Sequence, residues 1–521
     1  MAETRARPAR GALGSLSIPE MVCLWGILAI GLLLRVAAID WGLPPATPEM
    51  AASGIRSSYA LDEDNVLESL VRTDPARFDI DPKLYHWGTL HLELVLGALE
   101  GAQAAGIFER PWRETFRQMV PGEFEKVYVV GRLVSVIADL VTVFLAFLLG
   151  VEAAGPRAGL WAAALVSFCA GHVLQASQIR VDVTATTLVT LTALLAARLD
   201  ATTRPKNWLA VGLAAGLAVS AKYSTLLIVA AVVALPLWKN RPRSRAARWA
   251  LVGVLAGFLS GEPFVITNGI EVARQVGRLI WLSRQIPAEI LIPMPILLGQ
   301  HVADLARFSL GIPAVVLAGY GLWALRRRKA PLFAVLAVAL LAGIVSLLPQ
   351  NWPLMRYHLP LAPLCAVAAG AAIVHLPRWS GPLAGALALA FALGASIAQV
   401  RFMLYPHPAN LALAVVQKAV PAGETVARIM PELPPLDPAQ YPMGPNPLMD
   451  DLTKDPPRWV IVSDLPIIDY PEANQRLLES RYQPIAVFRS RRVFAWATLG
   501  ETGAPHDWKY THASMTFYRL Q

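Results

Sequence analysis

Long apolar runs separated by short polar loops constrain this chain more than any other feature. Nine such runs lie at residues 21–39, 128–150, 158–174, 183–197, 249–267, 308–325, 330–348, 360–376 and 381–400. Most approach the roughly 20 residues that a helix needs to cross a hydrocarbon core about 30 Å thick. The stretch 208–238 is too long for one span and is interrupted by Lys222 and Tyr223, so we interpret it as two short spans. The pattern predicts a mainly α-helical, polytopic membrane protein with about eleven transmembrane helices.

The composition agrees with a membrane protein and argues against nucleic-acid binding. Only 16% of the 521 residues are charged, whereas soluble domains carry about 25%. The net charge is +9, but the basic residues form short clusters between apolar runs, as at 239–248 and 326–329, and not one basic face. Such clusters are typical of cytoplasmic loops. The three cysteines, Cys23, Cys169 and Cys365, lie in apolar runs without ligand spacing, and we expect buried thiols.

The apolar segment 85–107 decides the predicted orientation. If this segment does not cross the membrane, the basic segments between the spans share one side with the basic N-terminus; if it crosses, they all fall outside, against the positive-inside rule. The segment also carries two histidines and two glutamates, which are costly in mid-bilayer. We therefore expect a juxtamembrane helix at the outer interface, within an external loop of about residues 40–125.

This orientation divides the chain into three parts. Residues 1–20 form a cytoplasmic N-terminus, residues 21–400 a membrane module, and residues 401–521 a small extracytoplasmic α/β domain. In that domain we expect strands near 459–463, 485–488, 493–498 and 515–520 and a helix near 472–480.

Acidic residues gather at two places on the predicted outer boundary. Asp62 and Glu63 lie in a Leu-Asp-Glu-Asp-Asn sequence of the first external loop, and Asp182 precedes the span 183–197. Both places are also typical of helix starts, where carboxylates act as caps. The functional interpretation is a general base at the mouth of a membrane cavity, with Asp62, Glu63 and Asp182 as the catalytic candidates.

Cations from four separate external segments point to an anion site. Lys83, Arg180, Lys222 and Arg356 all fall on the predicted outer side. Each alone could extend toward lipid headgroups. Their convergence on one face favours a site for the natural membrane anion, a lipid phosphate.

A metal site is the alternative for the acidic and imidazole groups. Asp62, Glu63, Asp64, His86, His91 and Asp182 offer suitable ligand atoms. None of them has a spacing that indicates metal binding, so we expect no cofactor and keep a divalent cation as the alternative.

Several short motifs resemble those of the bacterial polyprenyl-phosphate-dependent GT-C glycosyltransferases, which include protein O-mannosyltransferases and aminoarabinose transferases. The resemblance covers most of residues 20–400, and each motif is short. In chain order the motifs are Asp62-Glu63, FDIDPKLYHWG at Phe78–Gly88, Gly131-Arg132, Arg180-Val181-Asp182, the Gly-rich run Gly216–Tyr223 ending in Lys222-Tyr223, and Arg356-Tyr357 followed by Pro360 and Pro363.

The resemblance implies an inverting glycosyltransferase of the cytoplasmic membrane, acting on its outer face. Asp62 would be the catalytic base, and Lys222, Tyr223, Arg356 and Tyr357, with Lys83 and Arg180, would lie near the donor phosphate. The expected partners are a polyprenyl-phosphate-linked sugar, a protein, lipid or glycan acceptor, and membrane lipid. His86-Trp87 departs from the mannosyltransferase pattern and no sugar-recognition insert is found, so the sugar and the acceptor stay open.

The chemistry of such a donor suits these residues. A polyprenyl phosphate is already a good leaving group, so one base and a few cations suffice, unlike the carboxylate pair of a glycosidase. Two alternatives stay open. An O-antigen ligase or polymerase would use a late loop with His301, Arg307, Arg356 and His358, and a lipid-linked sugar transporter would show inverted repeats, which we do not find.

Overall fold

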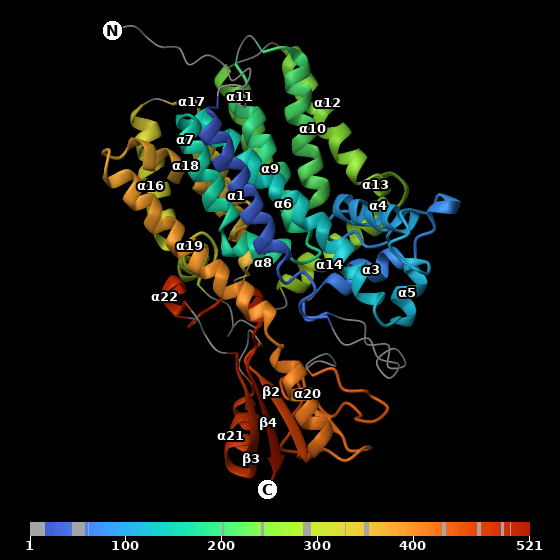
Figure 1. The fold of residues 1–521 in the computed structure, drawn as a ribbon. Coiled ribbons are helices and arrows are strands. Elements are labelled where there is room, and N and C mark those ends of the chain that lie inside the picture. Colours follow the sequence, from blue (N-terminus) through green and yellow to red (C-terminus); the bar gives the residue numbers. More distant parts are fainter. Residues whose placement is uncertain are drawn as a thin grey trace.

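Each predicted span is largely helical in the structure. The computed structural model describes residues 16–43, 58–60, 62–200, 203–240, 244–284, 293–328, 330–348, 354–429, 434–465, 470–490, 494–500 and 502–521. The helices that correspond to the predicted spans are α1 (Ile18–Val36), α6 (Phe124–Ala154), α7 (Pro156–Ser167), α9 (Val181–Ala197), α10 (Pro205–Ala221), α11 (Leu226–Asn240), α12 (Ser244–Gly261), α16 (Ile312–Arg327), α17 (Pro331–Leu347), α18 (Leu361–His375) and α19 (Ser380–Leu404). They form one elongated bundle (Figure 1).

Two details of the span prediction bear on the site. The predicted break within 208–238 is confirmed, because Lys222 and Tyr223 lie between α10 and α11; that each of these helices is a span stays a prediction. The predicted span 158–174 is instead broken, since α7 and α8 (Ala170–Ala176) meet at 57°. By length and composition, three helices of the described segments can each cross a membrane. The number of spans rises to five if each of two bent helix pairs is counted as one further span. The chain is thus a multi-pass membrane protein, and eleven crossings stay a prediction.

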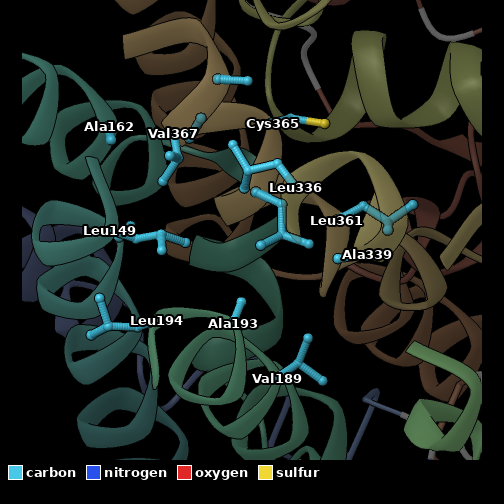
Figure 2. Close-up of a cluster of buried hydrophobic side chains, with 14 of the residues drawn as sticks. Leu149, Ala162, Val189, Ala193, Leu194, Leu336, Ala339, Leu361, Cys365 and Val367 are labelled. Carbon is cyan, nitrogen blue, oxygen red and sulfur yellow. The ribbon is translucent and has the colours of Figure 1, made fainter. Parts of the chain in front are cut away.

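Small residues let the helices of the bundle approach closely. Gly212 and Gly216 of α10 face α12, where a Cβ on Gly216 would lie 2.1 Å from the carbonyl oxygen of Val254. The core between α6, α7, α9, α17 and α18 mixes alanines with leucines and valines, among them Leu149, Ala162 and Val189 (Figure 2). Such close approach is how helices pack where lipid provides no hydrophobic drive. One expectation is wrong here: Cys169 and Cys365 are buried, but Cys23 is exposed on α1, most of whose side chains lie on the surface of the bundle.

The loop between α1 and α6 contains four short helical segments and packs at one end of the bundle. It contains α3 (Glu63–Val71), the 3₁₀ turn η1 (Pro75–Arg77), α4 (Leu90–Ala104) and α5 (Trp112–Gln118). The predicted helix 85–107 is confirmed as α4, which runs across the bundle axis (Figure 1). It begins at Leu90, five residues later than expected. Gly88 has a φ of 114°, outside the helical region, and the backbone N–H of the N-cap residue Thr89 donates to the Glu262 carboxylate at 2.8 Å.

The connection from α12 to α16 lies at the same end. It carries α13 (Phe264–Thr267), α14 (Gly269–Arg284), α15 (Met294–Asp304) and a π-helical turn, η4 (Leu305–Ser309). The amphipathic helix α14 exposes apolar side chains such as Ile270 and Trp281. Two 3₁₀ turns, η2 (Tyr223–Thr225) and η5 (Met355–His358), precede α11 and α18.

The C-terminal residues form the predicted small α/β domain. After α20 (Pro408–Ala419), the strands β1 (Val426–Ala427), β2 (Trp459–Ser463), β3 (Tyr482–Phe488) and β4 (Met515–Leu520) make a sheet of order β1-β2-β4-β3, with α21 (Glu472–Arg481), α22 (Ala495–Thr498) and α23 (His506–Lys509). β1 pairs parallel to β2, and β4 pairs antiparallel to β2 and β3. The strand predicted near 493–498 is wrong, because residues 495–498 form the short helix α22.

The domain shares a hydrophobic core with the end of the bundle. Trp508 and Phe517 of the domain belong to one buried cluster with Phe308 and Met355 from the membrane module. Arg307, in η4, donates to the carbonyl oxygens of Thr498, Gly500 and Thr502 at 3.0 to 3.2 Å. The domain is therefore docked by both apolar packing and hydrogen bonds.

Candidate active site

A cavity of about 510 Å³ opens where the α3–α4 loop meets the ends of α9, α10 and α18. Residues from six chain segments line it, which are 62 and 66, 86–87, 179–182, 222–224, 276 with 279–280, and 356–357. Lys206 lies in the first turn of α10 and Lys222 just past its end, so about 25 Å of helix separate them. The cavity and the basic segment 198–206 are therefore at opposite ends of the bundle, as the sequence predicted; which end faces the cytoplasm stays a prediction.

Asp62 is fixed at the mouth of the cavity by two arginines. Its Oδ2 accepts hydrogen bonds from Nη1 of Arg356 at 2.6 Å and from Nη1 of Arg180 at 2.9 Å. Asp62 occupies the N-cap position of α3, but its side chain makes no capping hydrogen bond. Its φ of 82° lies in the left-handed region, which Asp and Asn tolerate better than other non-glycine residues. The capping interpretation is thus right about the position and wrong about the side chain.

The arginines keep Asp62 ionised. Burial by itself raises the pKa of this carboxyl, but the charges and hydrogen bonds of Arg356 and Arg180 outweigh it and hold the pKa well below its usual range. Both hydrogen bonds end on Oδ2, and within the described residues no donor is found on Oδ1. One oxygen anchors the side chain, and the other is left to receive a proton.

Asp182 and Lys222 form a second ion pair on the cavity wall. Asp182 stands in the first turn of α9, and its Oδ1 accepts from the Lys222 ammonium. That ammonium also lies 5.2 Å from the ring centroid of Tyr357, within cation–π range. A second, smaller pocket shares Lys222, Ser224 and Arg356 with this cavity. Three cations thus converge on one space, which is suited to an anion.

Glu63 does not line the cavity. Its Oε1 and Oε2 accept from Nε and Nη2 of Arg132 at 2.9 and 2.6 Å, and both side chains are fully buried. The same carboxylate accepts from the backbone N–H of Ile179 and the hydroxyl of Ser58. With every oxygen held away from the pocket, Glu63 supports the loop that carries Asp62, and the structure gives no geometry for its predicted catalytic role.

Lys83 is also not brought into the cavity. Its side chain is exposed, its φ is 55°, and its backbone N–H donates to Asp81 at 2.9 Å. Its carbonyl accepts from the side chain of Gln275 on α14. The turn at Lys83 positions the loop against α14, and the remaining seven predicted site residues all line the cavity.

His86 and Trp87 belong to the cavity although we did not predict a role for them beyond the metal alternative. Their rings pack edge to face at 4.2 Å, and the Trp87 carbonyl accepts from the backbone N–H of Tyr223 at 3.2 Å. Burial lowers the pKa of His86, although the charge of Asp62 nearby opposes the shift. In the sequence, only the departure of His86-Trp87 from the mannosyltransferase pattern indicated that these two residues belong to the site.

The groups considered for a metal are dispersed. The side chain of His91 is buried against the hydroxyl of Thr184, with Nδ1 2.8 Å from Oγ1, and Asp182 pairs with Lys222. In the parts of the chain that the structure describes, no three His, Cys, Asp or Glu side chains gather as a metal site would require.

Comparison with known proteins supports the predicted reaction class. Residues 124–266, from α6 into α13, match the family model of dolichyl-phosphate-mannose-protein mannosyltransferases. The match covers residues 124–266 of the 521, and over this segment the chain is similar to glycosyltransferases. The matched segment contains Arg180, Asp182 and Lys222 of the cavity, while Asp62 and Arg356 lie outside it. No curated protein matches the sequence significantly.

Solved structures show more distant likenesses. The oligosaccharyltransferase of Archaeoglobus fulgidus with a tethered acceptor peptide is 14% identical with a TM-score of 0.47, over 89% of this chain and 72% of that one. ArnT of Cupriavidus metallidurans bound to undecaprenyl phosphate is 12% identical with a TM-score of 0.44, over 95% and 97%. The S. cerevisiae protein O-mannosyltransferase Pmt1–Pmt2 complex bound to the sugar donor is 15% identical with a TM-score of 0.34, over 50% and 34%.

Proposed function

We propose that this protein is a glycosyltransferase that moves a sugar, with inversion, from a polyprenyl-phosphate carrier to a nucleophilic acceptor on the extracytoplasmic face of a bacterial cytoplasmic membrane. The observation that carries the proposal is the single cavity in which Asp62 meets Arg180, Arg356 and Lys222. A base beside several cations is what the displacement of a phosphate requires. No metal or organic cofactor is part of the proposal.

The reaction assigns a distinct task to each group. Oδ1 of Asp62 takes the proton from an acceptor hydroxyl or amine, whose heteroatom attacks the anomeric carbon. The bond between that carbon and the phosphate oxygen breaks, and the polyprenyl phosphate departs with the bonding electrons. Lys222 and Arg356 stabilise the charge that grows on the departing phosphate. Attack opposite the leaving group inverts the anomeric centre.

The walls of the cavity suit an amphiphilic donor. Val276, Leu279 and Ile280 of α14 line the cavity together with the charged groups. Leu279 and Ile280 are 42% and 50% exposed, so an apolar surface continues from the cavity to the outside of the protein. A prenyl chain covering these side chains would bury apolar area at about 25 cal/mol per Å². The sugar and the acceptor stay open.

The ligase alternative has less support from the geometry. Arg307 donates to three carbonyl oxygens of the C-terminal domain, which makes it a docking residue. Nδ1 of His301 lies 2.7 Å from Nε2 of His358, and both rings are buried. Neither group faces the cavity, whereas Asp62 does.

The test is the substitution Asp62→Asn, assayed for transfer from a polyprenyl-phosphate sugar and for loss of a surface glycan in cells. Asn tolerates the left-handed backbone at this position, so the variant is expected to fold. We expect transfer to fall by about 10²- to 10⁴-fold, the usual contribution of a general base. Asp64→Asn, which removes the same charge two residues away and outside the cavity, is the matched control. Near-normal turnover in the Asp62 variant would remove Asp62 from the mechanism.

A further inference from the structure

An aspartate of the C-terminal domain reaches the backbone of the active-site arginine. Asp507, in the short helix α23, is 1% exposed. Its Oδ1 accepts from the backbone N–H of Met355 at 2.7 Å, and its Oδ2 accepts from the backbone N–H of Arg356 at 3.0 Å. Oδ2 also accepts from Nε2 of Gln175, on α8, at 3.1 Å. One buried carboxylate therefore connects the domain, α8 and the turn that carries Arg356.

The turn needs such a partner. Met355 and Arg356 are the first two residues of the 3₁₀ turn η5, and the first N–H groups of a helical turn have no acceptor within it. A side-chain carboxylate close in sequence normally supplies the cap. Here the carboxylate comes from about 150 residues further along the chain. Buried N–H groups without an acceptor are costly, so the turn is stable in this form only while the domain is docked.

α23 is itself firmly held. Trp508, the next residue, is 1% exposed and packs against Phe308 of the membrane module, with ring centroids 5.3 Å apart. His506 and Tyr510 on either side are linked through Nδ1 and the hydroxyl at 3.0 Å. The position of Asp507 is therefore fixed by packing before it meets η5.

We propose that the C-terminal domain is a functional part of the donor site, with Asp507 as the positioning residue that sets the backbone of Arg356. This rests on the proposed function, in which Arg356 meets the donor phosphate. The guanidinium of Arg356 also binds Asp62 at 2.6 Å, so a shift of η5 would displace the base and the phosphate ligand together. Displacements of about 1 Å in the positions of catalytic or binding groups are enough to lower activity or binding strongly.

A binding experiment on the full-length protein in detergent tests this proposal. Undecaprenyl phosphate is the probe, and undecaprenol, which lacks the phosphate, is the comparison ligand. We expect Asp507→Ala to weaken binding of the phosphate about tenfold, a typical coupling between contacting groups, and Asp507→Asn, which keeps one acceptor oxygen, to weaken it less. Thr511→Val is the matched control, because it removes the hydrogen bond from Gln399 at 2.8 Å, which also joins the domain to the bundle, and one to the Trp508 carbonyl at 3.3 Å, without touching η5.

A double-mutant cycle separates positioning from general loosening of the fold. If Asp507 acts through Arg356, adding Asp507→Ala to Arg356→Gln causes no further loss of phosphate binding. Equal losses in both backgrounds, or a Thr511→Val variant as weak as Asp507→Ala, would overturn the inference. Should Asp507→Ala fail to fold, the Asp507→Asn variant is carried through the same cycle and decides the question. If the wild type binds undecaprenyl phosphate no better than undecaprenol, the proposed function fails as well, a result distinct from failure of Asp507 alone.

Discussion

The substitution Glu63→Gln tests whether the carboxylate of Glu63 has a structural role or a catalytic one. Glu63 and Arg132 are both fully buried, and four hydrogen bonds reach the carboxylate from Arg132, Ile179 and Ser58. Removing the charge leaves the Arg132 guanidinium buried without its counter-charge, which costs about 3–5 kcal/mol in comparable pairs. Arg132 also donates to the carbonyl oxygens of Ile39 and Trp41, so we expect a loss near the lower end, about 3 kcal/mol.

Thermal unfolding of the purified protein in detergent measures this loss. We expect the unfolding midpoint of Glu63→Gln to fall by several degrees. Glu68→Gln is the matched control, because Glu68 lies on the same helix but is exposed, and such surface changes stay within about 0.5 kcal/mol.

The transfer assay gives the other half of the test. Because Glu63 holds the backbone N–H of Ile179, next to Arg180, its substitution should lower transfer in step with stability and to a smaller extent than Asp62→Asn. A Glu63→Gln variant that unfolds at the wild-type temperature and has lost transfer completely would refute this reasoning and restore the catalytic role that the sequence suggested.

The helices of the membrane module were largely predictable because lipid restricts the chain so strongly. A backbone in hydrocarbon has to satisfy its own hydrogen bonds, so apolar length alone indicates a helix. The break at Lys222 and Tyr223 was visible for the same reason, since a cation interrupts an apolar run only at an interface or a cavity. The bend between α7 and α8 was not visible, because no proline or charge marks it in 158–174.

The site was predictable as a set of loop residues but not as a set of side-chain directions. Asp62 and Glu63 are adjacent in sequence, but Asp62 is the N-cap with a left-handed backbone and Glu63 is the first helical residue, so one side chain faces the cavity and the other faces Arg132. Lys83 shares the motif region but lies in a left-handed turn that exposes its side chain. Asp507 could not be found from the sequence, because its role depends on a contact between two domains.

Two further predictions concern the walls of the site and the docked domain. Gly88→Ala should destabilise the protein by more than about 2 kcal/mol, because φ is +114° and a Cβ would lie 2.2 Å from the Ser220 carbonyl oxygen. Gly97→Ala, in the interior of α4 with open space around its Cβ, should instead stabilise the protein by about 0.5–1 kcal/mol in the same thermal unfolding assay. His506 makes stability depend on pH. Burial lowers its pKa from 6.5 to about 4, so below pH 6.5 the unfolded chain binds the proton first. Stability therefore declines between about pH 6.5 and pH 4, by roughly 3 kcal/mol at most, and levels off below that range. In His506→Gln this part of the decline should be absent from unfolding midpoints measured across the same range, and an unchanged pH profile would show that His506 titrates normally in the folded protein.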